Sequence, residues 1–302
     1  MLRRLRSFFD ERGFFEVETP LLSRDTVIDR HLDPMTVDLD AMSEFRYLQT
    51  SPEFAMKRLM ADGAVAIYQI CKAFRADELG DMHNPEFTIV EWYRKGDDLD
   101  QGMTLLSDLA EALIERGPAS RISYTEAFAQ HAGLDPHQIS NADLAEAVLR
   151  LGIIVPESLS VEDRDAWLDM ILVECVQPNL GVDNPAILYD YPANQAALAR
   201  TRREGDIELA ERFELFVDGV ELANGYHELL DPEVLRNRNQ MANRLRGEDG
   251  KERLPESSRL LDAMDVGLPP CAGVALGFDR LIMVAFGASS IRDVLAFPFD
   301  RA

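Results

Sequence analysis

Arginine, histidine and acidic side chains gather around a hairpin in the first third of the chain. The run "FRADELGDMHNPEF" (74–87) joins two segments rich in β-forming residues, 65–75 and 86–94, and so predicts an antiparallel hairpin. Arg75 ends the first strand, beside the loop that carries His83. Because a guanidinium presents a planar fork of donors, Arg75 suits a phosphate or a carboxylate. The alternative is a solvated loop in an acidic protein.

The second strand of this hairpin carries an acid among aromatic and apolar residues. Side chains alternate along a strand, so Phe87, Ile89, Glu91 and Tyr93 point to one face. An unpaired buried carboxylate is costly. We therefore expect this face to line a pocket whose ligand carries positive charge. An edge strand with Glu91 in solvent remains the alternative.

A second pair of acids flanks a tight turn at Asp218-Gly219, a strong hairpin signal. Pairing across this turn sets Glu214 opposite Ala223 and predicts that Glu214 and Glu221 share a face. Two such carboxylates could bridge Mg²⁺, which prefers oxygen ligands. The spacing fits equally well with both acids facing water.

Polar groups continue beyond that hairpin with Asn224 and Glu228. Near the end of the chain, "CAGVALGFDRLIMVAFG" (271–287) predicts a glycine-bearing strand that runs into a helix. Arg280 lies at the start of this helix, where it could meet a phosphate together with the positive end of the helix dipole. These stretches together predict an ATP site with a metal.

The elements that must position these residues begin with an amphipathic helix over 2–13 and a strand that Pro20 stops. Ser51 is expected as a helix N-cap, with Pro52 at the first helical position. Residues 97–180 show helical periodicity, and 232–263 are charged and helical. Strands at both ends with helices between them indicate an α+β fold built on an antiparallel sheet.

The amino-acid composition weighs against several classes of protein. Among 302 residues, 31 Lys and Arg face 54 Asp and Glu, giving a formal charge of −23 that weighs against a large nucleic-acid partner. The three cysteines form no zinc-binding pattern. No run of about twenty apolar residues predicts a membrane span, and we expect a cytoplasmic protein without a membrane partner.

Three stretches of the sequence resemble, in order, the motifs of class II aminoacyl-tRNA synthetases: "GFFEVETP", "FRADELGDMHNPEFTIVEWY" and "GVALGFDRL". The runs "TSPE", "HNPEFT" and "FELFVDGVELANGYHEL" are similar to lysyl-tRNA synthetases in particular. The resemblance implies a class II catalytic core that spans 1–302 as one domain, with a helical insertion at about 97–180. It also implies a homodimer.

Two departures refine the resemblance. The chain starts just upstream of the first motif, so no N-terminal OB-fold is expected, and Ala275 stands where lysyl-tRNA synthetases usually have glycine. Both features resemble the synthetase paralogues that activate (R)-β-lysine with ATP and ligate it to a lysine of elongation factor P. The partners implied are elongation factor P, ATP and (R)-β-lysine or lysine, without tRNA. The alternatives are a minimal tRNA-charging enzyme and a catalytically silent paralogue.

The resemblance also implies roles for individual residues. The ATP-binding group would be Arg75, Asp77, Glu78, His83, Phe87, Glu214, Glu221 and Arg280, with Arg75 and Arg280 catalytic and Glu214 and Glu221 holding Mg²⁺. The amino-acid group would be Glu53, Glu91, Tyr93, Asn224, Glu228 and Ala275. The family places glutamate two residues after its arginine; here that position is Asp77, followed by Glu78.

Overall fold

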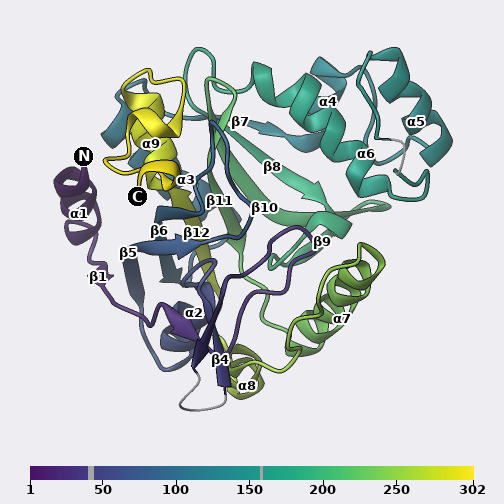
Figure 1. Cartoon of the computed structure of the whole chain (residues 1–302). Coiled ribbons are helices and arrows are strands. Elements are labelled where there is room, and N and C mark those ends of the chain that lie inside the picture. The colour runs from purple at the N-terminus through teal and green to yellow at the C-terminus, as the bar shows by residue number, and fades with distance from the viewer. Residues whose placement is uncertain (40–43, 157–158) are drawn as a thin grey trace. The chain divides into compact units, whose positions relative to one another are not determined.

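Three neighbouring strands carry the residues around Glu91. In the computed structural model, β5 (Ala66–Phe74) and β6 (Glu86–Lys95) form the antiparallel hairpin that the sequence predicts, and β12 (Cys271–Gly277) pairs with β6 on its other side (Figure 1). Glu91 consequently lies on a central strand, which rules out the edge-strand alternative.

The structure describes residues 1–39, 44–156 and 159–302. These fall into two compact units: the N/C unit, made of Met1–Gly102 and His227–Ala302, and the middle unit, Met103–Tyr226.

The N/C unit is built on β5, β6 and β12, with β1 pairing with β5. A separate three-stranded sheet has the order β2-β4-β3. The other elements of this unit are α1 (Leu2–Asp10), β1 (Phe15–Glu16), β2 (Leu22–Ser23), β3 (Thr36–Leu39), β4 (Glu44–Leu48), α2 (Glu53–Ala61), α7 (Pro232–Glu248), α8 (Arg259–Val266), α9 (Phe278–Ala285), η5 (Ile291–Asp293) and η6 (Phe299–Arg301).

The middle unit has the strand order β11-β10-β8-β7, with β9 paired to β10. The helices α4, α5 and α6 lie together in it (Figure 1), around a core that includes Phe128 and Leu168. Its elements are β7 (Ser120–Ser123), α4 (Tyr124–His131), α5 (Asn141–Arg150), α6 (Arg164–Ile171), η2 (Leu172–Val176), η3 (Gln177–Asn179), β8 (Ala186–Pro192), η4 (Ala193–Gln195), β9 (Thr201–Glu204), β10 (Ile207–Val217) and β11 (Val220–His227). The helix α3 (Leu99–Ile114) starts in the N/C unit and continues into the middle unit.

The α+β class is confirmed, with one correction to the expected sheet. Most strand pairs are antiparallel, but β1 pairs with β5 and β7 pairs with β8 in parallel. Parallel neighbours need a crossover connection, and α4, α5 and α6 lie between β7 and β8 along the chain. The strand arrangements that contain β5 and β8 are therefore mixed, whereas the three-stranded sheet β2-β4-β3 is antiparallel.

Aromatic stacking holds α1 against the hairpin. Phe9 stacks on Tyr68 of β5 with ring centroids 4.6 Å apart, and it meets Trp92 of β6 at 5.2 Å. Trp92 belongs to the strand face opposite Glu91, so α1 covers that face with apolar contact. The expected helix over 2–13 ends earlier, at Asp10.

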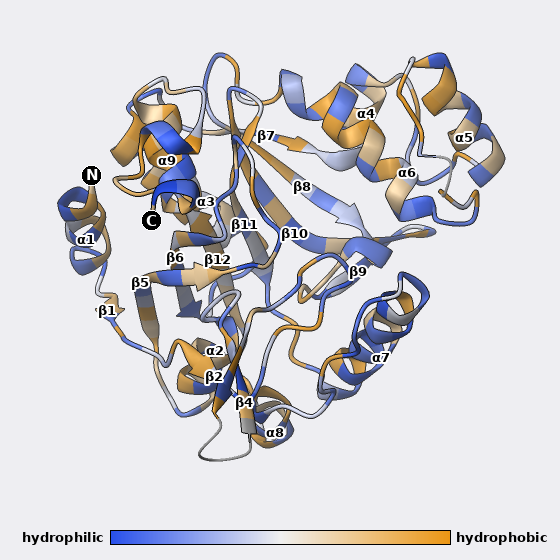
Figure 2. Ribbon diagram, viewed as in Figure 1, coloured by the Kyte–Doolittle hydropathy of each residue, from blue (hydrophilic) through white to orange (hydrophobic). Residues whose placement is uncertain are grey.

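The helix α7 shows the charged character expected for 232–263 and is coloured mostly hydrophilic in Figure 2. One of its charged residues is nevertheless buried: Arg246 is 2 % exposed. Its guanidinium donates to the backbone carbonyls of Asp29, Leu32 and Glu252 and to the Asp33 carboxylate. Arg246 thus holds a loop by satisfying backbone acceptors.

Within the part of the chain that the structure describes, no helix is both long enough and apolar enough to cross a membrane.

Two glycines of the middle unit allow a matched test of packing. Gly181 and Gly205 both have positive φ, +74° and +61°, but a Cβ at Gly181 would lie 2.3 Å from the backbone oxygen of Phe216, whereas one at Gly205 would meet nothing within 4 Å. We expect Gly181→Ala to lower the free energy of unfolding by roughly 3 kcal/mol and Gly205→Ala by about 1 kcal/mol, since only the first adds a clash to the conformational strain. Urea denaturation measures both; equal losses would contradict the packing argument.

Candidate functional site

Three buried carboxylates of the N/C unit form the centre of the site. Glu53 lies in the first turn of α2, Glu91 in the middle of β6, and Glu228 directly after β11. Glu91 and Glu228 are each 1 % exposed and Glu53 is 8 % exposed. This burial excludes the alternative in which Glu91 lies in solvent. We call these three residues the carboxylate cluster.

A lysine that the sequence reasoning missed lies inside the cluster. The Lys57 Nζ is 2.5 Å from an oxygen of Glu53 and 2.5 Å from an oxygen of Glu228. Lys57 follows Glu53 by four residues on α2, which is the spacing at which helical side chains meet. That spacing is the signal that could have identified it.

Hydroxyl groups bind the third carboxylate. Ser51 donates to one oxygen of Glu91 at 2.6 Å, and Tyr93 donates to the other at 2.7 Å. The Ser51 hydroxyl also accepts from the backbone N–H of Glu53 at 3.1 Å. The expected N-cap is corrected by one residue, because α2 starts at Glu53 with Pro52 as its cap.

The pairing of β12 with β6 places residues of β12 next to the carboxylate cluster. Ala275 lies opposite Glu91 and Gly273 lies opposite Tyr93, so each pair shares a face of the sheet. A Cβ on Gly273 would lie 2.2 Å from the Tyr93 ring and 2.4 Å from Glu228 Oε1. Only a residue without a side chain fits there, because the tyrosine and the glutamate fill that space.

Burial shifts the ionisation of the cluster. Desolvation raises the pKa of Glu91 to about 7, and the nearby Glu53 charge acts in the same direction. Desolvation also raises the pKa of Glu228 to about 8, against the lowering effect of Lys57. Burial lowers the pKa of Lys57, but the charges of Glu228 and Glu53 outweigh it and leave the pKa raised. Lys57 is therefore charged near neutral pH, whereas Glu91 and Glu228 hold protons in part.

Arg75 lies at the end of β5, as expected, and its guanidinium carbon is 5.0 Å from the centre of the Phe87 ring. It also contacts Glu78 at 3.4 Å. Asp77 is exposed and has a φ of 62°, so it forms the turn rather than contacting Arg75. Of the two neighbouring acids, Glu78 is thus the one directed toward the arginine.

His83 and Arg280 meet across the loop. A terminal nitrogen of Arg280 is 2.5 Å from His83 Nε2, and its Nε donates to the Met82 carbonyl at 3.1 Å. Burial and the positive charge of Arg280 lower the pKa of His83. His83 is therefore a neutral acceptor from Arg280 near pH 7. The structure brings together these two residues, which the sequence separates widely.

The acids expected to hold Mg²⁺ belong to the middle unit. Val217 opposes Val220 and Phe216 opposes Glu221, as predicted, but Glu214 lies opposite Asn224, not Ala223. The register shifts between Leu215 and Phe216, because a bulge adds one residue to β11 and moves each later pair by one position.

Glu214 already has two donors in this structure, and no group of three or more His, Cys, Asp or Glu residues that could hold a metal ion is found among the described residues. Glu214 is buried, and its two oxygens accept from Arg212 and from the Tyr191 hydroxyl, each at 2.5 Å. Asn224, its partner across the strands, has a buried Oδ1 without a hydrogen-bond partner in the described structure. Glu221 is half-buried on the same hairpin. Carboxylate and amide oxygens of this kind fit Mg²⁺.

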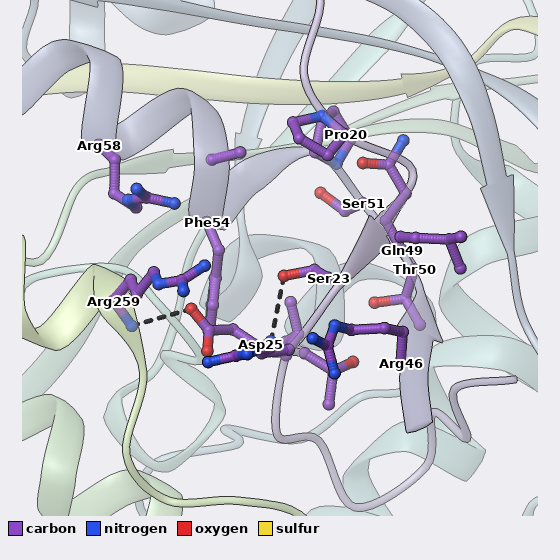
Figure 3. A pocket seen from close by; sticks show the side chains of 16 residues that line it. Pro20, Ser23, Asp25, Arg46, Gln49, Thr50, Ser51, Phe54, Arg58 and Arg259 are labelled. Carbon is purple, nitrogen blue, oxygen red and sulfur yellow. Dashed lines mark hydrogen bonds between the residues drawn. The ribbon is translucent and has the colours of Figure 1, made fainter. Parts of the chain in front are cut away.

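A cavity of about 340 Å³ lies beside Ser51 (Figure 3). Arg24, Arg46, Arg58 and Arg259 line it, together with Ser51. Since Ser51 also donates to Glu91, it connects the cavity lining to the carboxylate cluster.

Comparison with known proteins shows the family to which the chain belongs. Residues 1–301 match the family described as tRNA synthetases class II (D, K and N), so the chain belongs to that family. Among individual relatives, the Elongation factor P--(R)-beta-lysine ligase of Salmonella gallinarum is 43 % identical over 306 aligned positions, which cover 100 % of this chain and 94 % of the relative. Proteins of the same name from Salmonella dublin and Salmonella paratyphi B are 42 % identical, with the same coverage.

The raised pKa of Glu91 predicts a pH dependence of stability. A carboxyl whose pKa rises on folding contributes stability below its ordinary pKa of 4.5, and this is lost as the pH rises through about 7. We expect Glu91→Gln to remove this loss. Between pH 5 and pH 8 the free energy of unfolding, measured by thermal denaturation, should then fall by roughly 2–3 kcal/mol less in the variant than in the wild type. Glu86→Gln, on the exposed end of the same strand, is the control. Parallel stability curves for the wild type and Glu91→Gln would contradict the assignment.

Proposed function

We propose that this protein is an ATP-dependent ligase that activates (R)-β-lysine as an aminoacyl-adenylate and transfers it to a lysine side chain of elongation factor P. The full-length similarity to ligases of that name supports the proposal. The observation that carries it is the layout of β6, where Phe87 and Glu91 lie on one strand face. That face presents an arginine–aromatic pair at one end and the carboxylate cluster at the other.

The nucleotide takes the end of this face near Arg75. Arg75 holds the α-phosphate and the substrate carboxylate, where negative charge develops during adenylate formation. His83 and Arg280 bind the distal phosphates, and Phe87 and Arg280 enclose the adenine. The 3.4 Å contact with Arg75 favours Glu78 over Asp77 as the acid that reaches toward the nucleotide.

The amino acid takes the end near the cluster. Glu53 and Glu91 receive the amino group closer to the carboxylate, and Glu228 and Tyr93 receive the ε-ammonium, with Asn224 assisting. Buried carboxylates are costly without a cation, and the two ammonium groups of β-lysine supply positive charge. The methyl group of Ala275 lies opposite Glu91 and shapes the floor of the pocket.

Glu214 and Glu221 are the residues that would hold Mg²⁺. When bound, the ion neutralises charge on the phosphates of ATP.

The reaction then needs no side-chain nucleophile. A carboxylate oxygen of the amino acid attacks the α-phosphorus of ATP, and the bond to pyrophosphate breaks. The neutral ε-amine of the acceptor lysine next attacks the carbonyl carbon, loses a proton and displaces AMP. The chain's own residues contribute by positioning and by stabilising charge.

The proposal includes the cellular location, oligomeric state, domain bounds and partners that the sequence predicts. The protein acts in the cytoplasm as a homodimer, with one catalytic domain over 1–302 and an insertion at about 97–180, and it has no tRNA partner. The acidic composition supports the last point, because phosphate backbones are repelled by a charge of −23.

A transfer experiment tests the proposed function. The protein is incubated with ATP, Mg²⁺, radiolabelled (R)-β-lysine or α-lysine, and either elongation factor P or bulk tRNA. We expect label on elongation factor P, with (R)-β-lysine preferred. Transfer to tRNA but not to the factor would favour a tRNA-charging enzyme. No amino-acid-dependent pyrophosphate exchange would favour a catalytically silent paralogue.

Ala275 offers a test of amino-acid selectivity. Removing its methyl group opposite Glu91 enlarges the pocket floor, so we expect Ala275→Gly to gain use of α-lysine relative to (R)-β-lysine by roughly tenfold in kcat/KM, as one methyl group is worth about 1–3 kcal/mol. Pyrophosphate exchange with each amino acid measures this ratio. An unchanged ratio removes Ala275 from the determinants of selectivity.

A further inference from the structure

Lys57 is a buried cation whose recorded ion-pair partners are two members of the carboxylate cluster. Its side chain is 2 % exposed, and its Nζ lies 2.5 Å from both Glu53 Oε1 and Glu228 Oε2. The Tyr93 ring lies 5.9 Å from the same nitrogen. One ammonium group therefore fixes two carboxylates that come from different parts of the chain.

The other buried cation of this unit, Arg246, behaves differently. Three of its four acceptors are backbone carbonyls of a loop and of a segment near α7, which is the pattern of a structural staple. Lys57 instead binds side chains that face Tyr93 and Gly273, where the amino acid is proposed to bind. Structural support alone does not account for a charge placed there.

The formal charges around Lys57 match a ligand with two positive charges. Glu53 on α2, Glu91 on β6 and Glu228 after β11 contribute three carboxylates, and Lys57 contributes one ammonium. The other titratable groups facing the cluster are Tyr93, Cys71 and Cys271, and burial raises the pKa of each well above neutrality, so they are uncharged. When fully ionised, the cluster thus retains two negative charges.

One oxygen of the cluster has no hydrogen-bond donor among the described residues. Glu228 Oε1 is buried and has no hydrogen-bond partner in the described structure, while its other oxygen lies next to Lys57. A buried carboxylate oxygen without a donor is costly. The ion pair with Lys57 therefore orients Glu228 so that its second oxygen points to a place where a donor would be favourable.

We propose that Lys57 is a specificity-determining positioning residue, a built-in ammonium that orients Glu53 and Glu228 and sets the cluster's charge to select an amino acid with two ammonium groups. The inference rests on the proposed function, because it assumes that the amino acid binds at this cluster. Lys57 acts through the two glutamates and takes no part in the covalent steps.

Steady-state pyrophosphate exchange across pH 6–9 tests this role, with (R)-β-lysine and with (R)-3-aminohexanoate, which lacks the distal ammonium. We expect Lys57→Met to raise the KM for (R)-β-lysine about tenfold with kcat within about twofold, because ground-state binding is lost. Without the lysine charge the carboxylates of the cluster hold their protons more tightly. The pH at which kcat/KM rises should therefore be higher by about one pH unit. Selectivity over (R)-3-aminohexanoate should fall.

Three further variants separate charge from folding. Lys95→Met removes a lysine charge at the exposed end of β6, away from the carboxylate cluster, and should leave KM and the pH profile unchanged. The double variant Glu53→Gln with Lys57→Met restores the charge balance and should return the pH profile toward that of the wild type. If Lys57→Met does not fold, Lys57→Arg keeps the charge and should show a raised KM with an unshifted pH profile.

The outcomes are distinct. If wild-type protein shows no exchange with (R)-β-lysine, the proposed function fails and the inference fails with it. If the wild type is active but Lys57→Met keeps the wild-type KM and pH profile, the inference alone is overturned. A loss confined to kcat and melting temperature, with an unmoved pH profile, assigns Lys57 a merely structural role and also overturns it. A shifted pH profile in Lys57→Arg, which keeps the positive charge, would also overturn the inference.

Discussion

A carboxylate removed from water must find a positive charge, a proton or several donors. The N/C unit buries three carboxylates close together, and the elements around them are arranged to meet that cost. The helix α2 carries Lys57 to Glu53 and Glu228, and two hydroxyl groups satisfy Glu91. The shifted pKa values of the cluster express the cost that remains, which a cationic ligand is suited to remove.

The strand β6 gives this chemistry its geometry. Its pairing with β5 and β12 on either side makes it rigid, and its alternation puts Phe87 on the same face as Glu91. Phe87 and Glu91, which we propose contact the nucleotide and the amino acid, thus share one backbone instead of depending on two mobile loops. Binding geometry fixed by a scaffold in this way is the condition for catalysis by positioning.

Local patterns predicted much of this arrangement, and long-range packing decided the rest. Strand alternation identified the face of Glu91, and the Asp218-Gly219 turn fixed the first pairs of its hairpin. The position of Glu214 relative to Asn224 was missed, because the bulge in β11 depends on contacts across the sheet that no local pattern encodes. Lys57 was overlooked because a lysine on a helix is ordinarily solvated. The parallel pairs escaped prediction because they join segments distant in sequence.

The bare backbone at Gly273 has a consequence for how such a pocket can change. Where side chains line a pocket, its size can be altered gradually by exchanging one residue for a larger or smaller one. Here Tyr93 and Glu228 rest directly against the main chain of β12, so the wall at this point is the peptide backbone itself. In the proposed amino-acid pocket, a substrate of another length cannot be accommodated by trimming that wall. Redesign of the pocket for a new chain length has to begin at the opposite positions, on α2 and β6.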